Sequence, residues 1–186
     1  QLGAIEKPDA AQEFVAIIER HSERLHRLVE DLLELSKLES KDAALAVTPM
    51  AVAEPVARAV ELLAHLARAR GATVTADVAA EVPRVAAERR ALEQVLTNLV
   101  ENAIKYSPEG ARVVVRARTT RDGARISVED NGPGIEARHL PRLFERFYRV
   151  DTGRSRALGG TGLGLAIVKH LCEAMGASVT VESVVG

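Results

Sequence analysis

The stretch NLVENAIKYSPEG, from Asn98 to Gly110, has a helical pattern that carries two asparagines among apolar residues. Asn98 and Asn102 are four residues apart, so their side chains lie on one face of the helix, one turn apart. Asparagine is a poor helix former, and an amide buried without a hydrogen-bond partner costs free energy. We therefore expect both amides to have partners, either neighbouring backbone groups or a bound ligand.

The patterns on both sides of this stretch alternate between helix and strand. Apolar periodicity predicts helices at residues 53–70, 88–106 and 163–175. It predicts strands at residues 45–48, 73–78, 112–119, 124–130 and 178–182. The turn between two of these strands contains Arg121, Asp122 and Gly123. These elements predict an α+β domain, a two-layer sandwich with helices on one face of a mixed sheet.

A longer helix precedes this domain. Pro8 and Asp9 form a start signal, and the pattern ends near Glu39 and Ser40. Its apolar positions follow alternating steps of four and three residues: Phe14, Ile18, His21, Leu25, Leu28, Leu32 and Leu35. Such a heptad seam is typical of helices that pack against partner helices in a bundle. We therefore divide the chain into a helical segment, 1–41, and a domain, 42–186.

Composition limits the classes of function. The chain has 186 residues, of which 47% are hydrophobic and 3% aromatic, and its net charge is −1. This charge balance gives no reason to expect nucleic acid or a membrane surface as a partner. The single cysteine, Cys172, fits a reducing compartment, and no apolar run approaches the ~18 residues of a membrane span. We expect a cytoplasmic chain without direct membrane contact.

The stretch VEDNGPGI, from Val128 to Ile135, is a second candidate for chemistry. A predicted strand delivers Asp130 into a turn that contains Gly132 and Gly134. Glycine allows close approach of a ligand to the backbone and permits positive φ. A carboxylate at this place can accept a hydrogen bond from the amino group of adenine. The alternative is an ordinary Asn-Gly turn without a ligand.

The stretch GGTGLGLAIVKHL, from Gly159 to Leu171, is a third candidate. Gly160, Gly162 and Gly164 alternate just before a predicted helix. A glycine-rich loop at a helix N-terminus offers free N–H groups and the positive end of the helix dipole to phosphate. The spacing is neither that of the Rossmann fingerprint nor that of the P-loop.

An irregular segment, from Arg138 to Gly160, separates these two glycine-rich stretches. It contains six arginines: Arg138, Arg142, Arg146, Arg149, Arg154 and Arg156. Such a run is either a solvated face or a source of charge for a triphosphate. A long irregular segment is typical of a functional lid, and Phe144 and Phe147 are its expected anchors to the core.

Together and in this order, the segments resemble the sensor histidine kinases, within the superfamily of gyrase-, Hsp90- and MutL-like ATPases. The resemblance covers the family's N, G1, F and G2 boxes, here NLVENAIKYS, VEDNGPGI, LFERFYRVD and GTGLGLAI. The leading HSERLHRLVEDLLELSKLES resembles the second helix of the dimerisation hairpin. The resemblance implies a Bergerat-type ATP-binding domain, a homodimer through the N-terminal helix, and a response regulator receiver domain as partner. It also implies a membrane-anchored full-length sensor.

The resemblance also implies a role for each site residue. Asn98 and Asn102 would hold Mg²⁺, Lys105 would contact a phosphate of ATP, and Tyr106 would lie near the nucleoside. Asn98, Lys105, Arg146 and Arg149 would be the catalytic residues, the two arginines near the γ-phosphate. Asp130 would read adenine. The remaining nucleotide contacts would be Gly132, Gly134, Ile135, Gly160, Thr161, Gly162, Leu163 and Gly164.

The chain departs from the family pattern at both ends. No stretch resembles the helix that carries the phosphoacceptor histidine, so we assign that role to none of the five histidines. The family continues beyond Val185 into a last strand, which we expect to be truncated here. In gyrase-like relatives, a glutamate that activates water stands where this chain has Asn98. Without that base, we expect poor ATP hydrolysis and favoured phosphate transfer to a protein nucleophile. The alternatives are a nucleotide-gated interaction module without phosphotransfer and a gyrase- or MutL-like ATPase.

Overall fold

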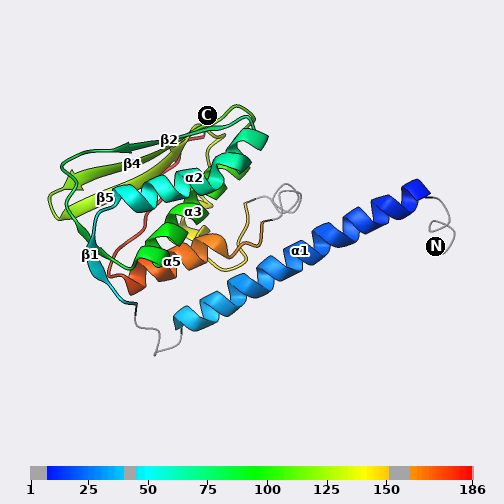
Figure 1. Cartoon of the computed structure of the whole chain (residues 1–186), viewed down its shortest axis with the longest axis horizontal. Helices are drawn as coiled ribbons and strands as arrows, with labels where there is room; N and C mark the ends of the chain where they lie inside the picture. The colour runs from blue at the N-terminus through cyan, green and yellow to red at the C-terminus, as the bar shows by residue number, and fades with distance from the viewer. Residues whose placement is uncertain (1–7, 40–44, 151–159, 186) are drawn as a thin grey trace.

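The computed structural model describes residues 8–39, 45–150 and 160–185. The chain begins with the long helix α1, Pro8–Glu39, which confirms the predicted leading helix. The elements that follow in sequence are β1 (Thr48–Met50), α2 (Ala53–Ala69), β2 (Thr73–Val78), β3 (Val85–Ala87), α3 (Arg89–Tyr106), β4 (Arg112–Thr120), β5 (Gly123–Asp130), the 3-10 helix η2 (Leu140–Arg142) and α5 (Gly164–Ala174). Figure 1 shows α1 extending away from the body that the other elements form.

The main sheet is mixed and has the strand order β2-β4-β5. β2 runs parallel to β4, and β4 runs antiparallel to β5. A two-residue turn closes the β4–β5 hairpin, since Thr120 pairs with Gly123. β1 and β3 form a separate antiparallel pair. Helices α2 and α3 lie on one face of the sheet, and α5 lies beside α3 (Figure 1), as the α+β prediction requires.

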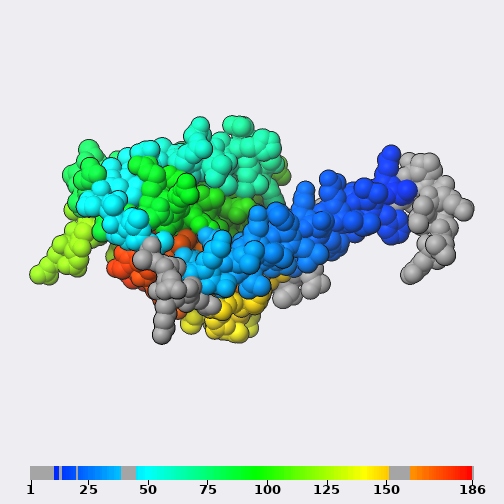
Figure 2. Space-filling view, turned by 60° about the horizontal axis from the view of Figure 1, so that its bottom comes forward, coloured from blue at the N-terminus to red at the C-terminus, as the bar shows by residue number. Residues whose placement is uncertain are grey.

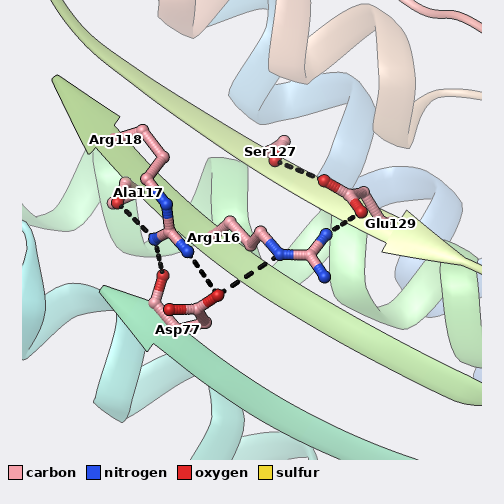
Figure 3. Close-up of polar contacts among 6 residues, drawn as sticks. All are labelled: Asp77, Arg116, Ala117, Arg118, Ser127 and Glu129. Carbon is pink, nitrogen blue, oxygen red and sulfur yellow. Dashed lines mark hydrogen bonds and ion pairs between the residues drawn. The ribbon is translucent and has the colours of Figure 1, made fainter. Parts of the chain in front are cut away.

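Alternation along β4 sets which side chains face the helices. Val113, Val115 and Ala117 are fully buried against them. Arg116, between these positions, points to the opposite face, where it meets side chains of the neighbouring strands (Figure 3). Asp130 is the cross-strand partner of Val113, and directly paired residues share a face of the sheet. The end of β5 therefore presents Asp130 on the helical side.

Two clusters of buried residues form the core. The first lies between α2, α3 and the sheet, with Val56, Leu96 and Val113 among its members. The second joins α3 and α5 to the C-terminal half of α1, where Leu35 is 1% exposed. Burying a leucine side chain contributes about 1.5–3 kcal/mol. The second core therefore attaches α1 to the domain, and Figure 2 shows this half of α1 lying against it.

The predicted seam of α1 is divided in the structure. Leu28 and Leu35 pack into the second core of the same chain, so α3 and α5 serve as partner helices for this part of the seam. Phe14, Leu25 and Leu32 remain 52%, 62% and 53% exposed. The seam is thus shared between a contact within the chain and an apolar stripe that is open to a partner. None of the described helices is long and apolar enough to cross a membrane.

The expected strand at residues 178–182 is wrong. Residues 177–185, all of which the structure describes, carry no strand. This segment packs instead against the turn after β5, where Ser183 Oγ accepts a hydrogen bond of 2.9 Å from the N–H of Ile135. A Cβ atom at Gly134 would lie 2.0 Å from the carbonyl oxygen of Val184, so only glycine allows this approach.

The first strand lies later than predicted. The sequence pattern placed it at residues 45–48, whereas β1 is Thr48–Met50. A tight turn precedes it, because the N–H of Val47 donates to the carbonyl oxygen of Leu45 at 2.9 Å. Pairing with β3 fixes the actual position, since Met50 pairs with Val85. Apolar content alone could not reveal this register.

Candidate functional site

A cavity of about 520 Å³ lies where α3, the turn after β5 and the glycine-rich segment before α5 meet. These segments are distant in sequence, yet each contributes predicted site residues to the wall. Those that line the cavity are Asn98, Asn102, Lys105, Tyr106, Asp130, Gly134, Ile135, Arg149, Gly160, Thr161, Gly162 and Gly164. Gly132, Arg146 and Leu163 are predicted site residues that do not line it. The size suits a nucleotide-sized ligand.

The two asparagines come from the face of α3 that borders the cavity. Glu88 caps the start of this helix by accepting hydrogen bonds from the N–H groups of Arg90 and Ala91, at 3.1 and 2.7 Å. Asn98 Nδ2 is buried and has no hydrogen-bond partner. Buried polar groups usually bond protein or ordered water, so this donor is available to a bound water or to a ligand in the cavity. Asn98 therefore does not follow the alternative in which its amide nitrogen caps neighbouring backbone.

Lys105 lies one turn beyond Glu101 on the same helix, and both line the cavity. Lys105 Nζ is 2.7 Å from Glu101 Oε1, and the lysine side chain is only 14% exposed. The pair fixes the ammonium group at the wall as a point charge. The sequence analysis assigned no role to Glu101, although its spacing of four residues from Lys105 is a readable signal for an ion pair.

Asp130 has a fixed orientation at the end of β5. Its Oδ1 atom accepts hydrogen bonds from the N–H of Gly132 at 2.8 Å and from Ser107 Oγ at 3.1 Å. Oδ2 remains as an acceptor for a further donor. A Cβ atom at Gly132 would lie 2.6 Å from Asp130 Oδ1 and 2.9 Å from Ser107 Oγ, so glycine allows the carboxylate to keep this orientation. Gly132 thus orients the Asp130 carboxylate although it does not itself line the cavity.

The arginine-rich segment holds the glycine-rich loop. The N–H of Phe147 donates to the carbonyl oxygen of Gly162 at 2.8 Å, and Arg149 Nη2 donates to that of Gly160 at 2.9 Å. Phe147 is 58% exposed, so the prediction that it anchors the segment to the core is wrong. Leu163 is fully buried in the second core, where it fixes the start of α5. Arg154 and Arg156 lie outside the described residues.

Several lining residues had no signal in the sequence analysis. Tyr148 lines the cavity, and its hydroxyl is 2.6 Å from His139 Nδ1. The guanidinium carbon of Arg142 lies 4.2 Å from the centre of the Tyr148 ring. Val181 and Glu182, from the C-terminal segment, also line the cavity. The position of each of these residues depends on how irregular segments pack against one another. The periodicity of apolar residues does not predict such packing.

Helix α1 supplies two further lining residues, Arg27 and Asp31. Burial raises the pKa of Asp31, and a hydrogen bond from Thr161 opposes this rise. The carboxylate of Glu101 adds to the rise through like-charge repulsion. The cavity thus contains two carboxylates on its α1 and α3 sides, together with the charges of Lys105 and Arg149.

Comparison with known proteins identifies this arrangement. Residues 87–186 match the family described as histidine kinase-, DNA gyrase B- and HSP90-like ATPase. The chain belongs to this family. Residues 2–41 match the His Kinase A (phospho-acceptor) domain. The presence of both regions in one chain confirms the resemblance to two-component sensor histidine kinases.

Curated histidine kinases share the sequence over nearly the whole chain. Sensor histidine kinase WalK of Bacillus subtilis (strain 168) is 35% identical over 99% of this chain and 30% of its own length. The phosphate regulon sensor protein PhoR of Pseudomonas aeruginosa is 39% identical over 91% of this chain and 38% of its own length. The chain thus spans about a third of the length of these relatives.

Solved histidine kinases share the fold. The crystal structure of full-length ShkA in complex with AMPPNP has a TM-score of 0.75 and 31% identity, over 89% of this chain and 34% of that one. Histidine kinase ThkA in complex with the response regulator protein TrrA has a TM-score of 0.64 and 26% identity, over 77% of this chain and 42% of that one. The histidine kinase ATP-binding fold is therefore established for this chain.

Proposed function

We propose that the chain is the catalytic core of a sensor histidine kinase that transfers the γ-phosphate of ATP to a histidine, for relay to a response-regulator aspartate. The observation that carries this proposal is the cavity in which Asn98, Asn102 and Lys105 of α3 meet Asp130 and the glycine-rich loop. We assign the acceptor role to none of the five histidines of this chain, so the acceptor would lie on a separate helix.

Asp130 is the residue that we assign to adenine recognition. Its Oδ1 is already bonded by Gly132 and Ser107, so the carboxylate is oriented before a ligand arrives. Oδ2 can accept a hydrogen bond from the exocyclic amino group of adenine, whereas guanine presents a carbonyl oxygen at the equivalent place. Gly134, Ile135 and Tyr106 line the same cavity, and we assign them to contacts with the nucleoside.

The phosphates are assigned to the opposite part of the cavity. The N–H groups of Gly160, Thr161, Gly162 and Gly164 precede or begin α5, where the helix dipole favours negative charge. Lys105 and Arg149 line the same cavity and would neutralise charge that develops during transfer. Arg146 is a proposed γ-phosphate contact that would require movement of its segment, because it does not line the cavity here.

The donor set of α3 fits a magnesium ion. Asn98 and Asn102 offer neutral amide oxygens, which are hard ligands of the kind that Mg²⁺ accepts alongside water and phosphate. Both side chains line the cavity, so their oxygens can reach an ion bound there, while the unpaired Nδ2 of Asn98 can donate only to water or to a ligand oxygen. When bound, Mg²⁺ would neutralise phosphate charge. A glutamate at position 98 would favour activation of water, so the asparagine supports transfer over hydrolysis.

The partners of the proposed kinase follow from α1 and from the relatives. The exposed residues Phe14, Ile18, Leu25 and Leu32 form an apolar stripe that suits a homodimer through α1. The complex of ThkA with TrrA supports a receiver domain as the second partner. We keep the boundary between helical segment and catalytic domain at residues 41 and 42, and a cytoplasmic location within a membrane-anchored sensor, as parts of this proposal.

Titration with Mg-ATP tests the nucleotide site. Asp130→Asn keeps an oxygen for Gly132 and Ser107 but places an N–H₂ group where adenine needs an acceptor. We expect its affinity for ATP to fall by at least about tenfold, or ~1.4 kcal/mol, with an unchanged circular dichroism spectrum. Glu129→Gln is the matched control, because Glu129 precedes Asp130 but bonds Arg116 on the opposite face. Unchanged affinity in Asp130→Asn would remove this residue from the site.

Incubation with γ-labelled ATP and an isolated acceptor hairpin tests the chemistry. We expect label on the hairpin, slow release of free phosphate, and no label on the chain itself. Tight ATP binding without transfer would favour a nucleotide-gated interaction module. Rapid hydrolysis by the chain alone would favour a gyrase- or MutL-like ATPase.

A further inference from the structure

Helix α1 is part of the wall of the candidate nucleotide cavity. Arg27 and Asp31, one turn apart on α1, both line it, although the rest of the wall comes from residues 98–183. Arg27 turns its Nε toward its own helix, where it donates to the carbonyl oxygen of Glu23 at 3.3 Å. Asp31 is the carboxylate that α1 contributes to the wall, beside the guanidinium of Arg27.

Contacts on both sides of Asp31 hold α1 in this position. Leu28 and Leu35 pack into the second core together with Leu163 and Ile167 of the α5 region. Glu34 Oε2 accepts a hydrogen bond of 2.6 Å from Gln94 Nε2 of α3. These contacts lie one turn before and after Asp31 or beside it, so the docked helix fixes the carboxylate against the domain.

Thr161 is the partner of Asp31 across this contact. Hydrogen bonding to Thr161 lowers the pKa of Asp31 and so opposes the rise that burial causes, and Thr161 Oγ1 accepts from the N–H of Leu163 at 3.3 Å. Thr161 lies between Gly160 and Gly162, in the loop that the proposed function assigns to phosphate. Asp31 also faces the carboxylate of Glu101, and burial raises its pKa. The loop that interacts with the Asp31 carboxylate of α1 is therefore the loop that we propose for the phosphates.

We propose that docked α1 opposes binding of a nucleoside triphosphate, because the Asp31 carboxylate competes with the phosphates for Thr161 and repels their charge. This inference rests on the proposed function, since it requires phosphates at the glycine-rich loop. Linkage makes the effect reciprocal: a triphosphate that binds more weakly to the docked form releases α1 from the domain. Nucleotide occupancy and freedom of α1 are then coupled within one chain.

Calorimetric titration with Mg-ATP and with adenosine tests the competition. Asp31→Asn keeps the size of the side chain and removes its charge. We expect ATP to bind this variant roughly fivefold or more tightly than wild type, at the lower end of typical coupling. The affinity for adenosine, which has no phosphate, stays the same. Glu30→Gln is the matched control: it removes a charge from α1 at an exposed position, where Glu30 forms an ion pair with His26, and should leave both affinities unchanged.

Amide hydrogen exchange in residues 28–38 provides a second readout. We expect ATP to accelerate exchange there in wild type and to have less effect in Asp31→Asn. Equal ATP affinity of wild type and Asp31→Asn, an equal gain for adenosine, or unchanged exchange on adding ATP would each overturn this inference while the nucleotide site stands. Failure of wild type and both variants to bind ATP would instead overturn the proposed function.

Discussion

The backbone N–H of Phe147 donates a hydrogen bond to the carbonyl oxygen of Gly162, 2.8 Å away. Both residues have left-handed backbone, with φ of 61° at Phe147 and 79° at Gly162. A non-glycine residue in this region costs about 1–2 kcal/mol, so the strain at Phe147 is compensated by contacts such as this bond. The bond joins the arginine-rich segment to the loop that we assign to phosphate.

Replacing Gly162 should loosen this junction. In Gly162→Ala, the new Cβ would lie 3.0 Å from Phe147 Cα and 3.1 Å from its carbonyl carbon, and the positive φ adds about 1–2 kcal/mol of strain. We expect lower thermal stability and several-fold weaker ATP binding, measured by calorimetry. Gly176→Ala is the control, because Gly176 has φ of 72° but no atom within 4 Å of its Cβ position. Equal effects of the two substitutions would show that the contact with Phe147 carries no energy.

The cap of α3 should contribute stability without contacting a ligand. Glu88 accepts hydrogen bonds from the N–H groups of Arg90 and Ala91. Glu88→Ala leaves both donors without this partner, and we expect unfolding free energy to fall by about 1 kcal/mol in urea titration. Glu88→Gln keeps an acceptor and should lose less. A large change of ATP affinity in Glu88→Ala would contradict a purely structural role for the cap.

The open stripe of α1 should mediate self-association. Leu25 is 62% exposed in the single chain. It belongs to the exposed part of the heptad seam, whereas Leu28 and Leu35 are occupied in the second core. We expect light scattering to show a dimer for wild type and dissociation at least about tenfold easier for Leu25→Glu, since a charge would be buried in an apolar interface. Leu62→Glu, at a 59% exposed position of α2, should leave the dimer unchanged. A wild type that is monomeric at high micromolar concentration would contradict the stripe's role.

Local chemistry predicts much of this structure. The period of apolar residues placed α3 within one residue of its observed start, because the helix buries one continuous face. Glycine-rich stretches marked the turn after β5 and the loop before α5, since positive φ and close contacts demand glycine there. These signals lie within short windows of sequence.

Long-range packing accounts for the parts that the sequence did not reveal. A heptad seam shows that α1 needs an apolar partner but not which partner, and part of it packs on the second core. Because α1 packs there, Arg27 and Asp31 line the cavity. The C-terminal segment has a strand-like composition, but its contact with Gly134 replaces a strand pairing. Such outcomes depend on three-dimensional contacts that no local pattern encodes.

The face of the sheet opposite the helices carries a charge network whose effect on stability should depend on pH. Arg118 and Arg116 both bond Asp77 of β2, and Arg116 also reaches Glu129 of β5, so the network spans three strands (Figure 3). The hydrogen bond from Arg118, with a further contribution from Arg116, holds the pKa of Asp77 below its ordinary value. Because the folded-state pKa is lowered, the contribution to stability is present above the ordinary pKa and is lost as pH falls through the lowered one.

Asp77→Asn should therefore reduce stability modestly at neutral pH and have progressively less effect in acid. Thermal unfolding of wild type and variant between neutral pH and about pH 2 measures this difference, with the two curves converging at the acid end. High salt should diminish the gap, because the network is exposed to solvent. Asp122→Asn is the control, since Asp122 is exposed in the turn between Thr120 and Gly123 and is not among the residues of this network. A gap that persists unchanged into acid would mean that Asp77 acts through its shape or hydrogen bonds alone, independently of its charge.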